Sequence, residues 1–152
     1  MKFAYISPST LPSRSANSVH VIMQCSALMR CTDEIVLYAK RTVAKKDSLA
    51  DALASAYGES LTSVRLVTFW SRLDYGNNLR IAMIAIYDLL RNEWPDIILS
   101  RNLYASLIIA VFFRKPILFE THQLELGFRK TMQRLIMNKP WVVTVVISDM
   151  LK

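Results

Sequence analysis

Short apolar runs alternate with segments of helical periodicity along the whole chain, and no other feature restricts the fold as strongly. The apolar runs are residues 3–6, 34–39, 64–69, 97–99, 116–119 and 141–147. The helical segments are residues 17–31, 48–57, 77–92, 102–113 and 124–137. Nearly continuous apolar strands are typical of a parallel sheet that helices cover on both faces. The alternation therefore predicts an α/β fold, with six strands in a doubly wound parallel sheet inside a three-layer α/β/α sandwich.

Polar and proline residues set the expected boundaries of these elements. Residues 7–15 contain two prolines and are expected to form the loop after the first strand. Lys40 and Arg41 are expected to begin a basic loop after the second strand, and Asp47 to cap the next helix. At 152 residues the chain has the size of one domain, and 53% hydrophobic residues exclude an intrinsically disordered chain.

Glycine and cysteine spacing excludes several kinds of site. The three glycines lie too far apart for a Walker loop or for the glycine-rich fingerprint that binds dinucleotides. Cys25 and Cys31 are six residues apart, which fits neither a zinc pair nor a disulfide within one helix. No metal site and no cofactor are expected, and free thiols suit the reducing cytoplasm.

The net charge of +7 indicates an anionic partner without identifying it. Residues 101–152 hold eight basic and three acidic side chains, so most of the excess lies there. A phosphorylated substrate or a lipid surface would fit, whereas nucleic acid is not expected because no binding motif for it is visible. The apolar stretch 103–113 is too short to span a bilayer, and no signal-peptide core follows Lys2. A cytoplasmic location is expected.

Ligands of an open parallel sheet bind beyond the carboxyl ends of its strands, near the point where the strand order reverses. This rule selects four loops: residues 7–16, 100–102, 120–122 and 148–149. The first loop leads into a helix N-terminus, where Arg14 and free backbone N–H groups could hold a phosphate or diphosphate. The alternative is that Ser15 and Asn17 only cap the helix while Arg14 is solvated.

Two histidines and an arginine are the candidate chemical groups of the site. His122, two residues after Glu120, is the best candidate general base, and a structural or solvated histidine is the alternative. Arg101 directly follows a buried strand, so it either faces the expected cleft or pairs with Glu120. His20 lies in the first turn of its helix, where it could instead bond a neighbouring loop.

Segment 124–137 carries a second candidate surface. Phe128, Met132, Leu135 and Ile136 form a stripe at helical spacing, and the basic residues around it are Arg129, Lys130, Arg134 and Lys139. A basic helix with such a stripe lies on anionic lipid, or it packs its apolar side on the sheet. Both interpretations are open at this point.

The order of the segments resembles the GT-B glycosyltransferases of family four, the group-one retaining sugar transferases. The matching segments are residues 1–7, Pro12, residues 16–21, 96–101, 116–122 and 142–148. Each motif is short, and their order and spacing over essentially the whole chain carry the resemblance. It implies that residues 1–152 form a single Rossmann-like, acceptor-binding domain, the N-terminal half of a GT-B fold. The C-terminal donor-binding domain would then lie outside this chain, which alone is expected to be inactive.

The resemblance also implies a reaction and its residues. A sugar would pass from a nucleotide-sugar donor to a glycan or lipid-linked acceptor, such as a cell-envelope polysaccharide, without a metal. The implied residues are Ser15, Ala16 and Asn17 near the donor diphosphate, His122 near the acceptor hydroxyl, and Arg101 and Glu120 along the same cleft. Family members with lipid-linked acceptors often have a basic first domain, which implies a peripheral membrane location.

Two positions depart from the family pattern. Ser15 and Ala16 stand where many members have a glycine pair, which allows the closest approach of backbone to phosphate. Thr32 and Asp33 stand where the family commonly has glycine and histidine before Glu34.

The alternative function is a non-catalytic α/β domain that binds an anionic ligand or a protein partner. Residues 148–152 are expected to begin a helix, which indicates a chain that continues beyond them.

Overall fold

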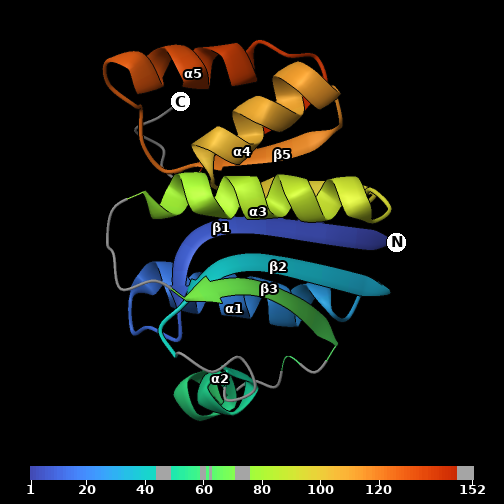
Figure 1. Cartoon of the computed structure of the whole chain (residues 1–152), viewed down its shortest axis with the longest axis vertical. Helices are drawn as coiled ribbons and strands as arrows, with labels where there is room; N and C mark the ends of the chain where they lie inside the picture. Colours follow the sequence, from blue (N-terminus) through green and yellow to red (C-terminus); the bar gives the residue numbers. More distant parts are fainter. Residues whose placement is uncertain (44–48, 59–60, 62, 71–75, 147–152) are drawn as a thin grey trace.

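A single sheet of six parallel strands forms the middle layer of the protein. The computed structural model describes residues 1–43, 49–58, 61, 63–70 and 76–146. The strands are β1 (Lys2–Leu11), β2 (Glu34–Arg41), β3 (Val64–Trp70), β4 (Ile97–Ser100), β5 (Ile117–Thr121) and β6 (Val142–Val146). Their spatial order is β3-β2-β1-β4-β5-β6, and Figure 1 shows β1, β2 and β3 side by side. The strand order reverses between β1 and β4, so the predicted doubly wound, Rossmann-like sheet is confirmed.

Helices cover both faces of this sheet. They are α1 (Ala16–Leu28), α2 (Leu49–Tyr57), α3 (Asn77–Arg91), α4 (Leu103–Ile108) and α5 (Phe128–Met137). Successive strand residues point to opposite faces, so Tyr5 packs with α1 and α2 while Ile6 packs with α3 and α4. A third apolar cluster joins α4 and α5 to Phe119 of β5. The three-layer α/β/α arrangement follows from these clusters.

The first strand is longer than the sequence predicts. Residues 7–11 belong to β1, where Thr10 and Leu11 pair with Lys40 and Arg41 of β2. The register shifts between Ile6 and Thr10, which accommodates a proline that has no N–H to donate. The loop predictions were therefore wrong for residues 7–11 and 40–41, because each of these two strands supplies the other with backbone partners, and they were right for residues 12–15, which connect β1 to α1.

Three helices differ from the prediction at their ends. Helix α1 begins after Ser15, which caps it by accepting from the Ser18 N–H at 3.3 Å, so Asn17 is not the cap. Helix α5 begins at Phe128 rather than at residue 124, because Gly127 has φ 57° and ψ −137°, which no helix contains. Segment 102–113 starts as α4 and continues as a π-helix over Ile109–Phe113. The expected cap Asp47 lies outside the described residues.

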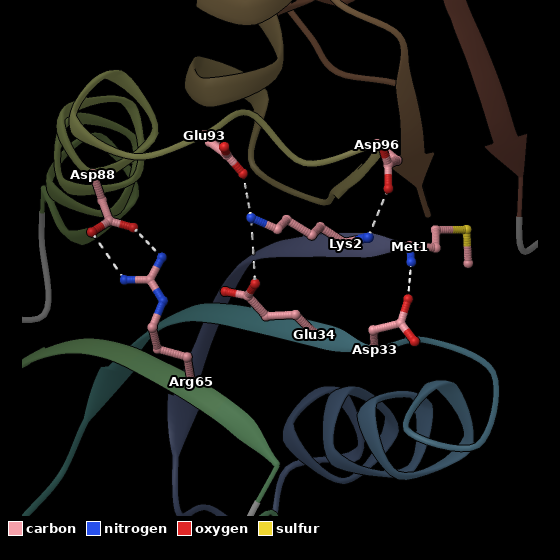
Figure 2. Close-up of polar contacts among 8 residues, drawn as sticks. All are labelled: Met1, Lys2, Asp33, Glu34, Arg65, Asp88, Glu93 and Asp96. Atoms are coloured by element: carbon pink, nitrogen blue, oxygen red, sulfur yellow. Dashed lines mark hydrogen bonds and ion pairs between the residues drawn. The ribbon is translucent and has the colours of Figure 1, made fainter.

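Ion pairs hold the amino edge of the sheet (Figure 2). Lys2 on β1 donates from Nζ to Glu93 at 2.5 Å and from its backbone N–H to Asp96 at 2.8 Å. On the neighbouring elements, Arg65 donates to both oxygens of Asp88, at 3.1 and 2.7 Å. These contacts connect β1 to the segment between α3 and β4, and they connect β3 to α3. The charged side chains at this end of the sheet therefore have a structural role and are not candidates for a ligand site.

Candidate active site

A cavity of about 670 Å³ opens at the carboxyl edge of the sheet, where the strand order reverses. Residues of β1 and β5, the first turns of α1 and α3, and the segments after β4 and β5 surround it. The lining residues are Pro8, Ala16, Asn17, His20, Asn78, Arg101, Leu103, Phe119, Glu120, Thr121, His122, Gln123, Glu125 and Arg129. The structure thus brings together six residues that the sequence selected, from three separate segments of the chain.

Arg14 and Ser15 lie outside this cavity. Because β1 extends to Leu11, the following loop is short, and it turns toward α2 rather than toward β4. Arg14 is exposed and lines a separate groove with residues of α2, including Tyr57. The Ser15 hydroxyl is committed to the α1 cap. Residues 148–149, the fourth predicted loop, lie outside the described residues.

The carboxylate of Glu120 is the centre of the site. Its Oε1 atom lies 3.1 Å from Nε of Arg101, 3.4 Å from Nε2 of His122 and 3.6 Å from Nε2 of His20. The Glu120 side chain is 2% exposed, and that of Arg101 is 6% exposed. The alternation of β5 explains this burial: Phe119 points toward α5, so Glu120 points to the opposite face, where α1 begins.

Opposite charges lie next to each other in the site, but several of its buried polar atoms make no hydrogen bond with the described residues. Arg101 Nε and Nη1, Glu120 Oε1 and His20 Nε2 are all buried without an aligned hydrogen-bond partner among the described residues. The same is true of Asn17 Oδ1, whose amide nitrogen donates to Ser9. Buried polar groups of this kind are rare in folded proteins. They make the cavity able to bind a ligand rich in hydrogen-bonding groups.

Arg101 is held in place by the segment that follows β4. Its backbone N–H donates to the carbonyl of Ile6 at 2.9 Å, which ties it to β1. Buried Asn102 caps α4 by accepting from the Ala105 N–H at 3.0 Å. The Asn102 amide also donates to the carbonyl of Asn78 at 2.7 Å. The start of α3 and the backbone that carries Arg101 are therefore tied together, and both Asn78 and Arg101 line the cavity.

Burial lowers the pKa of His122, and the charge of Arg101 lowers it further, while Glu120 acts in the opposite direction. The imidazole is therefore neutral near pH 7, which is the state required of a general base. Burial also raises the pKa of Tyr5, which lies behind the site and donates its hydroxyl proton to Gln24 at 2.5 Å. Tyr5 thus stays neutral as well.

Gln133 of α5 holds the loop that carries His122. Its side-chain nitrogen donates to Thr121 Oγ1 at 3.0 Å and to the Gln123 carbonyl at 3.1 Å. Its side-chain oxygen accepts from the Glu125 N–H at 3.0 Å. The sequence analysis did not identify this role of Gln133. A signal for it was present, since a polar residue directly follows Met132 of the apolar stripe.

A second ion pair closes the side of the cavity formed by this loop. Arg129 donates to both oxygens of Glu125 at 2.8 Å, and its guanidinium lies 6.0 Å from the centre of the Tyr104 ring. The two arginines of the lining, Arg101 and Arg129, are thus each neutralised by a carboxylate. Although the whole chain carries +7, the cavity lining is balanced in charge when its histidines are neutral.

The stripe on segment 124–137 divides between two environments. Met132 and Ile136 are buried in the cluster that joins α4 and α5, as the packing interpretation predicts. Phe128 and Leu135 are 79% and 47% exposed, so they do not pack on the sheet. No helix within the described ranges is both long and apolar enough to cross a membrane.

Neither metal-binding groups among the described residues nor comparisons with known proteins assign a function to the cavity. Within the described part of the chain, no group of three or more His, Cys, Asp or Glu side chains is placed to hold a metal ion. The sequence matches no family model, and a search of curated proteins finds no significant match. The resemblance to GT-B glycosyltransferases therefore depends on the motifs quoted above and stays a prediction.

Proposed function

We propose that this chain is the acceptor-side domain of a retaining glycosyltransferase, which transfers a sugar from a nucleotide-sugar donor to a glycan or lipid-linked acceptor. The acceptor would lie in the cavity around Glu120. The donor would be held largely by a C-terminal domain outside this chain. This proposal joins the resemblance of the motifs to the chemistry of the cavity.

One observation supports the proposal most directly: the cavity is balanced in charge but rich in unmatched hydrogen-bonding atoms. The carboxylates of Glu120 and Glu125 neutralise the two arginines, so little net charge is left to attract a phosphate. At the same time Arg101, Glu120 and Asn17 have donors and acceptors to spare. A sugar supplies many hydroxyl groups without charge and is therefore the ligand class that the cavity fits best.

The histidines and Glu120 supply acid–base chemistry in this proposal. Since Nε2 of His122 faces the Glu120 carboxylate, a proton on Nε2 is stabilised there and Nδ1 can accept from an acceptor hydroxyl. The carboxylate would stabilise the imidazolium as it forms. Arg101, whose Nε lies 3.1 Å from Glu120 Oε1, would hold the carboxylate in place beside the imidazole. His20 and Asn17 would orient the acceptor.

The test is a transfer assay on the native polypeptide, whose full length is first established by mass measurement and peptide mapping. A panel of nucleotide-sugar donors is supplied with saccharide and lipid-linked acceptors, and transfer is followed by mass spectrometry. His122→Asn is expected to lower kcat by about 100-fold or more, since it removes the base. Asn138→Ala, an exposed change at the far end of α5, serves as the control and is expected to keep full activity.

The alternative function, a domain that binds an anionic ligand or a protein without catalysis, gives different results. It predicts no transfer from any donor and tight binding of inorganic pyrophosphate in the cavity. Binding is measured by the NMR shifts of His20 and His122 during titration with pyrophosphate or with neutral disaccharides. Shifts caused by pyrophosphate alone, together with no transfer, would overturn the glycosyltransferase proposal.

A further inference from the structure

The outer side of α3 is apolar, although no described element covers it. Its large apolar side chains are Leu79, Met83, Tyr87 and Leu90, which are 50%, 57%, 60% and 57% exposed. Figure 1 shows α3 lying across the front of the sheet, with no described element in front of it. A helix on the surface of a folded protein normally presents polar side chains to water. An apolar outer side therefore indicates a surface that another body covers.

The core of the protein does not require these outer side chains. The inner side of α3 packs on the sheet through five buried residues: Ile81, Ala82, Ala85, Ile86 and Leu89. On the outer side, Arg91 donates from Nη1 to the Tyr87 hydroxyl at 2.6 Å, and its guanidinium lies 5.3 Å from the centre of the Tyr87 ring. These two contacts hold the ring in one orientation, so Tyr87 can serve as a fixed aromatic anchor for a partner.

The spacing of the outer side chains is nearly the same when α3 is read in the opposite direction. Met83 and Tyr87 each lie two residues from Ala85. Leu79 lies six residues before Ala85, and Leu90 lies five residues after it. Two antiparallel copies of α3 therefore bring Met83 opposite the partner's Tyr87, and Leu79 opposite the partner's Leu90. A symmetric contact between two copies of one chain requires this property, because the same patch of each copy must fit itself.

The exposed area of the four side chains is close to what a dimer interface needs. Large apolar residues present roughly 200–250 Å² when they are fully exposed, so at the observed exposures the four together present on the order of 500 Å² on each copy. Pairing two copies would therefore bury about 1,000 Å² in total, which is the lower limit for a specific interface. An interface of this size is expected to give a reversible dimer rather than a permanent one.

We infer that Leu79, Met83, Tyr87 and Leu90, here called the outer α3 stripe, form the interface of a symmetric dimer in which two copies of α3 pack antiparallel. The stripe begins directly after Asn78, which lines the cavity. The antiparallel arrangement places the partner's Leu90 beside this end of α3, so the partner lies next to the edge of the cavity. Exposure, spacing and area carry this inference, which does not depend on glycosyl transfer.

The test is sedimentation velocity of the full chain at concentrations from about 1 to 100 µM. The wild-type chain is expected to shift from monomer to dimer within this range. The double variant Met83→Ser, Tyr87→Ser removes the centre of the stripe and is expected to raise the dissociation constant by about tenfold or more. The matched control, Leu124→Ser with Leu126→Ser and Phe128→Ser, changes apolar residues that are even more exposed but lie away from α3, and it is expected to dimerise like the wild-type chain.

Cross-linking measures the relative direction of the two helices. Exposed Cys31 is first replaced by serine, and Met83→Cys and Tyr87→Cys are then made as two separate chains. In the antiparallel arrangement, a mixture of the two chains is expected to form the mixed disulfide several-fold faster than either chain forms a disulfide with its own copy. Faster disulfide formation between identical chains would contradict the antiparallel arrangement.

Other results overturn the inference. A wild-type chain that stays monomeric at every concentration, or a double variant that dimerises as well as the wild-type chain, excludes the stripe as a dimer interface. Loss of the dimer in the triple control variant alone would assign the interface to residues 124–128. A monomeric wild-type chain that floats with phosphatidylcholine vesicles, unlike the double variant, would assign the stripe to a lipid surface. Far-UV circular dichroism and thermal unfolding of each variant verify that a loss of the dimer is not a loss of fold.

Discussion

The Nε atom of Arg101 lies 3.1 Å from Oε1 of Glu120, and both side chains are almost completely buried at the ends of neighbouring strands. A buried ion pair adds little net stability compared with apolar residues of similar size, because both charges lose their hydration. Here the pair lies beside a cavity, where it keeps two charges in place and balanced. We therefore assign it to the site rather than to the core.

Breaking this pair is expected to destabilise the fold strongly. Glu120→Met leaves the Arg101 charge buried without compensation and is expected to lower the free energy of unfolding by about 3–5 kcal/mol. The double variant Glu120→Met, Arg101→Met removes both charges and is expected to recover most of that loss. Urea unfolding of the singles and the double measures the coupling. Glu93→Gln, in an exposed pair with Lys2, is the control and is expected to change little.

His122 is expected to titrate below its ordinary pKa of 6.5, because burial and Arg101 disfavour its charged form. Arg101→Met is expected to raise this pKa, and Glu120→Gln to lower it further. Imidazole NMR signals, followed against pH, measure each value. A midpoint at or above 6.5 in the wild-type chain would contradict the environment described for His122.

The same shift predicts how His122 affects stability. Its neutral form is favoured in the folded state, so its contribution is complete above pH 6.5 and is lost as pH falls from 6.5 through the lower folded pKa. The stability difference between the wild-type chain and His122→Asn is therefore expected to decrease below pH 6.5. Denaturant unfolding at several pH values measures this difference, and a constant value across the range would argue against it.

Gln133 is expected to act by positioning the loop of His122. In Gln133→Leu the leucine side chain is similar in size to glutamine, but three groups in segment 121–125 lose their hydrogen bonds to residue 133. A buried polar group left without its hydrogen bond is expected to lower the free energy of unfolding by about 1–3 kcal/mol. Hydrogen exchange is expected to become faster in segment 121–127 and to stay unchanged in α3. Asn92→Leu, which removes side-chain bonds at the opposite edge, is the control and should leave the loop protected.

Gly127 and Gly76 offer a matched comparison of backbone strain. Both have positive φ, but Gly76 has ψ 0°, near the left-handed region that asparagine tolerates, whereas Gly127 has ψ −137°. A Cβ atom at either glycine would meet no neighbouring atom within 4 Å, so only the backbone conformation differs. Gly127→Asn is expected to destabilise the fold by about 1–3 kcal/mol, and Gly76→Asn by much less. Equal losses in urea unfolding would contradict this interpretation.

Sequence patterns predicted correctly which strand ends lie around the cavity. Arg101, Glu120 and His122 follow apolar runs closely, and the carboxyl ends of parallel strands meet at one edge. The strands themselves were recognisable because burial on both faces requires apolar residues at nearly every position. Glu120 was nevertheless expected in a loop and lies on β5, since its pairing with Val145 depends on a strand that comes later in the chain.

The roles of residues that act across elements could not be predicted in this way. Gln133 looks like one polar residue in a helix until the loop before that helix folds back over it. Arg14 looks like a residue of the cavity until the pairing of Leu11 with Arg41 turns its loop away. In both cases the deciding contacts join positions that no local spacing relates.

Local periodicity and the need to bury apolar residues were enough to specify the α/β alternation, the parallel sheet and the end of the sheet at which the cavity opens. They could not specify that Glu120 lies among Arg101, His20 and His122, or that Leu126 and Phe128 point into solvent. Those features emerge from the folded chain because charge balance and exposure are properties of neighbours in space. Which residues become neighbours depends on the strand register, the placement of the helices and the direction of the loops, and these are set only when the whole sheet is assembled.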